Sequence, residues 1–150
     1  MTDTSHDIRT LNGLIATTID SVDGYEESAK AVDSGEYREL FAARASERRQ
    51  VARQLRGEVT RLGGNPEDDG TLLAGVHRVF LDLKATVATR DDKAVVAEVE
   101  RGEDHIKAKY EDALKDQDLT PETRSAIERA FGSVKAGHDQ MRDLKHGINA

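Results

Sequence analysis

The sequence predicts an all-α protein, a bundle of four long helices with a shorter helix between the second and third long ones. Two observations carry this prediction. Apolar residues recur every three or four positions, which is the spacing of one face of an α-helix and not that of a half-buried strand. Glycine and proline break this pattern at only a few places, so the stretches between them are long enough for helices of many turns.

The first two long helices are separated by Ser34 and Gly35. Thr4 or Ser5 is the expected N-cap of the first helix. Its inward stripe is Ile8, Leu11, Ile15, Thr18, Val22, Tyr25, Ala29 and Val32. The second helix continues the spacing through Tyr37, Leu40, Phe41, Arg44, Arg48, Val51, Leu55, Val59 and Leu62. Gly63-Gly64-Asn65-Pro66 then ends it, because glycine and proline commonly follow helix C-termini.

The rest of the chain predicts one short helix and two long ones. The short helix covers residues 71–89, and the next long helix opens at Asp91, where acidic residues favour a helix N-terminus. Its stripe is Val95, Val99, Gly102, Ile106, Tyr110 and Ala113. Thr120-Pro121 is a cap followed by proline at the first helical position. The last stripe is Ile127, Phe131, Val134, His138, Met141, Leu144 and Ile148.

The lengths of the connections predict how the helices are ordered. Short turns near Ser34 and Asp118 pair the long helices into two antiparallel hairpins, whereas residues 64–90 are long enough to return along the bundle. This is the connection of a ferritin-like four-helix bundle with an extra short helix in the crossover, and an ordinary five-helix array is the alternative. No internal repeat or change of composition divides the chain, so we expect a single domain over residues 1–150.

Composition excludes several classes of function. The 150 residues include no cysteine, which rules out disulfides, thiolate metal sites and a cysteine nucleophile. The net charge is -7 and the pI about 5.2, which argues against nucleic acid as a partner because such binding depends on clustered Lys and Arg. No apolar run approaches the length of a membrane span, and no signal-peptide pattern opens the chain. We therefore expect a cytoplasmic protein without a membrane partner.

Three phrases of the sequence together resemble a known family. They are Leu11-Asn12-Gly13-Leu14-Ile15 with Thr17-Thr18-Ile19-Asp20, Arg61-Leu62-Gly63-Gly64-Asn65-Pro66-Glu67-Asp68, and Glu100-Arg101-Gly102-Glu103-Asp104. They are similar to a bacterial family of ferritin-like four-helix-bundle proteins described as a domain of unknown function, and the similarity runs from about Ile8 to Lys145. The resemblance implies the fold and an ancestral carboxylate-bridged metal site, but no activity.

A ferritin-like di-iron site needs one Glu from each of two helices and a Glu-x-x-His pair from each of the other two. The candidates at a common level are Glu47, Glu103 and His138, which fall on the second, fourth and last predicted helices. Glu103 and His138 point into the core, whereas Glu47 falls at its rim. The pattern is incomplete, because Gln50 follows Glu47 where a histidine is needed and Lys135 precedes His138 where a glutamate is needed.

Two arginines decide between a metal and an ion pair at this level. Arg44 and Arg48 lie at the centre of the stripe of the second predicted helix. A guanidinium group stays charged and has no lone pair to give a metal, but it suits a buried carboxylate. We therefore expect a polar core layer of Arg44, Arg48, Glu103 and His138, with Thr18, Tyr25 or Glu47 filling the remaining hydrogen bonds.

Two hypotheses of function follow. The first is a non-catalytic structural or interaction module, without a cofactor, that forms a dimer or binds a protein partner through apolar residues at the stripe edges such as Ile19, Val79 and Leu81. The second is a degenerate metalloprotein that binds iron or manganese through Glu47, Glu103 and His138 and acts in iron or oxidative-stress handling. The second rests on fold analogy, which is a weak guide to function.

Overall fold

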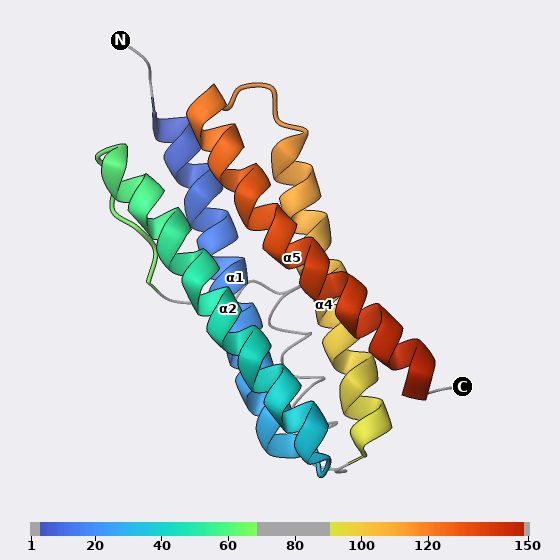
Figure 1. The fold of residues 1–150 in the computed structure, drawn as a ribbon. Helices are drawn as coiled ribbons and strands as arrows, with labels where there is room; N and C mark the ends of the chain where they lie inside the picture. The colour runs from blue at the N-terminus through green and yellow to red at the C-terminus, as the bar shows by residue number, and fades with distance from the viewer. Residues whose placement is uncertain (1–3, 69–90, 149–150) are drawn as a thin grey trace.

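The computed structural model describes residues 4–68 and 91–148, and within these ranges the chain forms four long helices and no strand (Figure 1). The all-α prediction is therefore confirmed. The short helix predicted over residues 71–89 lies outside the described residues. The four helices are α1 (Ser5–Ala31), α2 (Gly35–Arg61), α4 (Asp92–Leu114) and α5 (Pro121–Ile148).

The four helices pack as a square in which every neighbouring pair is antiparallel (Figure 1). Helix α1 lies between α2 and α4, and α5 contacts the same two helices from the opposite corner. As a result, α2 ends at the end of the bundle where α1 begins, and α4 begins at the other end. The two hairpins expected from the short turns, α1 with α2 and α4 with α5, are both present.

Local chemistry explains where the helices begin and end. The Ser34 side chain accepts a hydrogen bond from the backbone N–H of Tyr37 at 3.2 Å, so it caps the N-terminus of α2. At the other end of α2, Gly63 adopts a φ of 84°, a left-handed conformation that glycine takes without strain. Both features lie where the sequence predicted helix boundaries.

Two carboxylates tie the hairpins together at opposite ends of the bundle. Asp7 of α1 is 1% exposed and accepts hydrogen bonds from the hydroxyls of Thr120 and Thr123 at 2.7 and 2.8 Å. At the far end, Asp92 of α4 accepts the backbone N–H groups of Asp33 and Ser34 at 2.8 and 3.1 Å. These contacts hold the start of each hairpin against the turn of the other.

The described core consists of two apolar clusters separated by a polar level. The first cluster includes Leu11, Leu14, Ile15, Val51, Leu55, Val59, Ile106, Tyr110, Leu119, Ile127, Ala130 and Val134. The second includes Tyr25, Ala31, Val32, Phe41, Ala45, Val95, Val96, Val99 and Met141. Between them, each helix contributes a buried polar residue: Thr18, Arg48, Glu103 and His138. The candidate functional residues therefore lie midway along the bundle.

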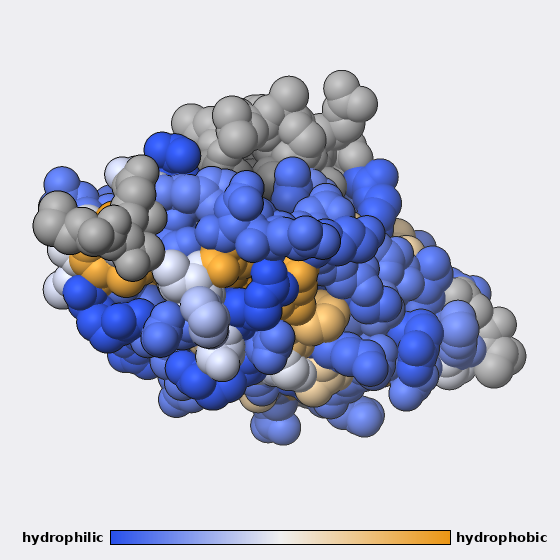
Figure 2. Space-filling view, turned by 90° about the horizontal axis from the view of Figure 1, so that it is seen from above, coloured by the Kyte–Doolittle hydropathy of each residue, from blue (hydrophilic) through white to orange (hydrophobic). Residues whose placement is uncertain are grey.

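The face seen in Figure 2 is mainly hydrophilic, and its apolar groups form small areas separated by polar side chains. This is the expected appearance of amphipathic helices that turn one face inward. None of the described helices contains a stretch long and apolar enough to cross a membrane.

Candidate functional site: a buried ion pair at the centre of the bundle

Arg48 and Glu103 form an ion pair in the middle of the bundle. Arg48 Nη2 lies 2.7 Å from Glu103 Oε2, and the two side chains are 0% and 2% exposed. The pair joins α2 to α4, which lie at opposite corners of the square. Arg48 comes from the centre of its apolar stripe, and Glu103 lies beside Gly102 in the stripe of α4, so the helical spacing directs both side chains inward.

The pair is embedded in a hydrogen-bond network whose members come from all four helices. Arg48 Nη1 donates to Ser21 Oγ at 2.7 Å, and the Tyr25 hydroxyl donates to Glu103 Oε1 at 2.7 Å. Arg48 Nη2 also donates to the Val134 carbonyl of α5 at 3.4 Å. The Arg48 guanidinium carbon lies 5.6 Å from the centre of the Tyr25 ring, within the range of a cation–π contact. Both oxygens of Glu103 are therefore occupied.

The network favours the charged form of Arg48 and the neutral form of Tyr25. Burial disfavours the charge of Arg48, but attraction to Glu103 and Tyr25 outweighs it and raises the pKa of the arginine. Burial, followed by repulsion from Glu103, raises the pKa of Tyr25 well above its usual value. The phenol therefore stays protonated at neutral pH and acts as a hydrogen-bond donor, not as a base.

Because Gly137 of α5 has no side chain, the ion pair can occupy the space beside it. A Cβ atom at this position would lie 2.5 Å from Arg48 Nη2 and 3.3 Å from Glu103 Oε2. The first distance is too short for any non-bonded contact, so a larger residue would have to displace the guanidinium group. Glycine inside a helix costs about 1 kcal/mol relative to alanine, and here it admits the ion pair.

Thr18 belongs to a second buried contact next to the ion pair. Its hydroxyl oxygen lies 2.7 Å from the Tyr110 hydroxyl, and it also donates to the Leu14 carbonyl at 2.7 Å. Burial raises the pKa of Tyr110 to about 12, although its hydrogen bond with Thr18 and the charge of Arg48 act in the opposite direction. The structure therefore places Thr18 in the polar level but bonds it to Tyr110, not to Arg48 or Glu103.

The shift of Tyr110 predicts a loss of stability at alkaline pH. Its folded-state pKa of about 12 exceeds the usual 10.0, so the unfolded chain releases this proton first as the pH rises. The stabilisation that protonated Tyr110 gives the folded state is fully present below pH 10 and is lost as the pH rises to about 12. We expect the wild type to lose on the order of 1 kcal/mol more stability than Tyr110→Phe by about pH 11, and roughly twice that by pH 12. Urea unfolding at several pH values measures the difference, and parallel losses in both proteins would contradict it.

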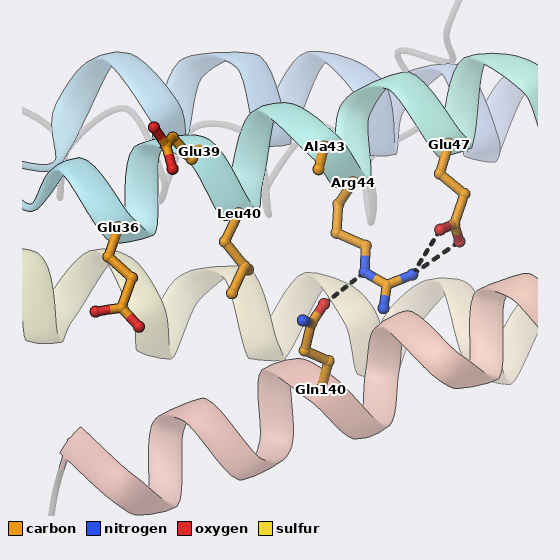
Figure 3. Close-up of a pocket in the computed structure, with 7 residues that line it drawn as sticks. All are labelled: Glu36, Glu39, Leu40, Ala43, Arg44, Glu47 and Gln140. Atoms are coloured by element: carbon orange, nitrogen blue, oxygen red, sulfur yellow. Dashed lines mark hydrogen bonds and ion pairs between the residues drawn. The ribbon is translucent and has the colours of Figure 1, made fainter.

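Arg44 does not occupy the core, which corrects the expectation that it shares the centre with Arg48. Its side chain is 15% exposed and lies at the edge between α2 and α5 (Figure 3). Arg44 Nη1 donates to both oxygens of Glu47 at 2.8 Å, and its Nε donates to Gln140 Oε1 at 2.7 Å. Glu47 also accepts from Ser133. Arg44 and Arg48 point in different directions because residues four apart on a helix differ by about 40° around its axis, and this rotation turns Arg44 toward α5.

A surface hollow of about 460 Å³ adjoins this edge (Figure 3). Arg44, Glu47 and Gln140 line one side of it, and Glu36, Glu39, Leu40 and Ala43 of α2 complete it. The Arg44 guanidinium is already held by its two partners, so it is not a free anion-binding group. The hollow is open and is lined mainly by charged side chains of one helix.

His138 is buried in the polar level, but its hydrogen bonds do not involve Glu103, which corrects the expectation of one shared layer. Its Nε2 lies 2.6 Å from Asp104 Oδ1, and its Nδ1 lies 3.3 Å from Asp139 Oδ1. The imidazole therefore faces the outer side of the α4/α5 pair. Glu103 and Asp104 are consecutive on α4 and lie about 100° apart around the helix axis. Glu103 therefore faces the centre of the bundle, whereas Asp104 faces His138.

The proposed ligand set of Glu47, Glu103 and His138 does not come together. Glu47 lies at the α2/α5 edge, Glu103 is bonded to Arg48 and Tyr25, and His138 faces Asp104. Among the described residues, two other groups bring at least three ligand atoms within 4.8 Å of one another. They are Glu100 with Asp104 and His138, and His6 with Asp116 and Asp118.

The fold and the ion pair at its centre together define a four-helix bundle that contains a buried arginine–glutamate pair. The chain belongs to the family described as Domain of unknown function (DUF2383), whose model matches residues 6–116. The expected membership in a family of unknown function is confirmed. The match ends before α5, so it is shorter than the span to Lys145 that the resemblance suggested. No curated protein matches the chain.

Sequence reasoning missed several members of the network. Ser21 was not expected because it lies beside the apolar stripe of α1, and its short side chain reaches Arg48 only because the guanidinium extends toward it. Gly137 has no side chain to mark it in an apolar pattern, although its position next to His138 at the polar level was a usable signal. Asp104 lies outside the predicted apolar stripe of α4, and 56% of its side chain is exposed, so helical periodicity does not point to it.

Proposed function

We propose that the protein is a non-catalytic, ferritin-like four-helix bundle that works as a structural or interaction module. One observation carries the proposal: the completely buried guanidinium of Arg48 lies 2.7 Å from Glu103, at the level where ferritin-like metalloproteins hold their metal. The antiparallel hairpins, with α2 ending and α4 beginning at opposite ends of the bundle, support the ferritin-like assignment.

The residues at the centre do not fit a di-iron site. A guanidinium group has no lone pair to offer, and it would repel a divalent ion by an energy on the order of several kcal/mol. Glu103 is the only described carboxylate buried at this level, and its two oxygens already accept hydrogen bonds from Arg48 and Tyr25. The buried tyrosines keep their protons at neutral pH, so neither of them acts as a general base.

Metal analysis of the purified protein and of Glu103→Gln tests this proposal. The variant keeps the shape of the side chain and removes its charge. We expect no iron or manganese bound at the centre, and hence the same metal content in both proteins. Stoichiometric iron or manganese that disappears in Glu103→Gln would overturn the proposal and support the alternative function in metal handling.

We further propose that the module acts by pairing with a second copy of itself. Several apolar side chains at the edges of the described core are only partly buried, among them Ile19, Leu40 and Leu144, and a partner could cover them. Val79 and Leu81, which the sequence placed in the same role, lie outside the described residues. Sedimentation velocity at increasing concentration measures the association, and a strict monomer at high micromolar concentration would contradict it.

A further inference from the structure

We propose that Glu100, Asp104 and His138 form a binding site for a divalent transition-metal ion such as Zn²⁺ on the outer side of the α4/α5 pair. The inference goes beyond the proposed function, because the site shares no residue with the Arg48–Glu103 centre. Glu100 and Asp104 are one helical turn apart on α4, and both face His138 on α5. Ligand atoms of all three residues lie within 4.8 Å of one another.

The donor set has the chemistry that zinc uses. Zn²⁺ is bound by imidazole nitrogen and carboxylate oxygen at roughly 2.0–2.2 Å, and sites with three protein ligands keep a fourth position for water or a small ligand. Tetrahedral ligands at these lengths lie roughly 3.4 Å from one another. The Asp104 carboxylate, now 2.6 Å from His138 Nε2, therefore has to withdraw slightly. Its side chain is 56% exposed and free to make that movement.

The His138 ring is held in one position, as a metal ligand needs to be. The side chain is 9% exposed, so packing holds the ring in place. Its Nδ1 lies 3.3 Å from Asp139 Oδ1, and a carboxylate on the second ring nitrogen is the usual partner of a metal-bound histidine. A proton on Nδ1 leaves the lone pair on Nε2, which points at Asp104. In this tautomer Nε2 can bind a metal ion, whereas with the proton on Nε2 the ring donates to Asp104.

The charged groups around the site carry both signs. The nearby acids are Glu100, Asp104 and Asp139. Against them stand Lys145, whose Nζ lies 3.4 Å from Glu100 Oε2, Arg142, whose Nη1 lies 3.5 Å from Asp139 Oδ1, and Lys135, whose charge also attracts the Asp139 carboxylate. Lys145 competes with the metal ion for the Glu100 carboxylate. Its side chain is 36% exposed and can turn to solvent when the metal binds. Asp104 opens the site to solvent, so the ion has a path of entry.

The other convergent group, His6 with Asp116 and Asp118, provides the contrast. It also contains a close imidazole–carboxylate pair, at 2.5 Å, but His6 is 39% exposed. Its carboxylate is partly engaged as well, because Asp116 Oδ1 accepts the backbone N–H of Asp118 at 2.9 Å. In this group the histidine is not buried, and no described carboxylate bonds its second ring nitrogen to fix the orientation of the ring. It is therefore a matched control for adventitious binding to a surface histidine.

Calorimetric titration of the full chain with Zn²⁺ tests the proposal. We expect binding of one ion in the micromolar range or tighter, weakened more than ~10-fold by Asp104→Asn and ~100-fold or more by His138→Gln. Removing the orienting carboxylate in Asp139→Asn should weaken binding ~10-fold. His6→Gln should leave the affinity for this ion unchanged. Circular dichroism confirms folding, and Asp104→Asn keeps the test valid if the buried His138 variant does not fold.

Three results would overturn the site: no Zn²⁺ binding below millimolar concentration, binding that Asp104→Asn leaves unchanged, or binding that only His6→Gln abolishes. The spectrum of bound Co²⁺ gives a second readout, because a tetrahedral ion with one histidine ligand should lose its visible absorption in Asp104→Asn. Failure of the proposed function is detected separately, since the Glu103→Gln variant should bind Zn²⁺ at this site with unchanged affinity.

Discussion

Replacing Arg48 by methionine is expected to lower the free energy of unfolding by about 3–5 kcal/mol. The substitution roughly preserves the length of the buried side chain but leaves the Glu103 carboxylate, which is 2% exposed, without its cation. It also removes the donor to Ser21. The loss reflects an uncompensated buried charge more than the net value of the pair, because desolvation offsets much of the attraction between its members. Urea unfolding at neutral pH measures it.

Arg44→Met is the matched control for this prediction. Arg44 lies one turn earlier on the same helix and also contacts a glutamate, but its partner Glu47 is 38% exposed. Water can solvate that carboxylate, so we expect a loss of no more than about 1 kcal/mol. The double variant Arg48→Met with Glu103→Met should recover much of the stability lost in Arg48→Met. Equal losses at the two arginines, or no recovery in the double variant, would show that the buried pair is not the cause.

Replacing Gly137 by alanine is expected to lower the free energy of unfolding by about 3 kcal/mol, the second-largest effect. The new methyl group would lie 2.5 Å from Arg48 Nη2, so the guanidinium must move away from Glu103. The displacement costs more than the gain of about 1 kcal/mol that alanine normally brings to a helix interior. Thermal or urea unfolding reveals the sign of the change.

Gly132→Ala separates the contact from the effect on helix propensity. Gly132 lies on the same helix, and a Cβ atom there would meet nothing within 4 Å. This substitution should stabilise the protein by about 0.5–1 kcal/mol. In an Arg48→Met background, Gly137→Ala should lose most of its cost, because a flexible apolar chain replaces the guanidinium. A stabilising Gly137→Ala in the wild-type background would contradict the close approach inferred from the structure.

The helix boundaries were predictable because they depend on local chemistry. Ser34, Gly63 and Pro121 act through the conformations and hydrogen bonds of their own neighbours, so a reader of the sequence can place them without knowing the tertiary structure. The inward position of Arg48 was also predictable, since it follows from helical spacing alone. The crossover helix expected over residues 71–89 stays a prediction.

The partners of the polar residues were less predictable, because they depend on contacts between helices. Periodicity places Arg44 and Arg48 on one stripe, but the side on which α5 approaches decides that only Arg48 is enclosed. Similarly, Glu103 and Asp104 are neighbours in sequence, yet one faces the centre and the other faces His138 at the α4/α5 edge. The angle of about 40° between Arg44 and Arg48 is too small for helical periodicity alone to assign them to different environments.

The position of the ion pair between two apolar clusters also determines how the hairpins can align. Sliding α2 along its neighbours by one turn, about 5.4 Å, would carry the guanidinium among aliphatic side chains of either cluster and separate it from its carboxylate. Apolar contacts alone distinguish these registers less sharply, because the side chains of both clusters are apolar. The charged pair thus selects a single longitudinal register for the bundle, in the way that one buried polar residue selects the register of a coiled coil.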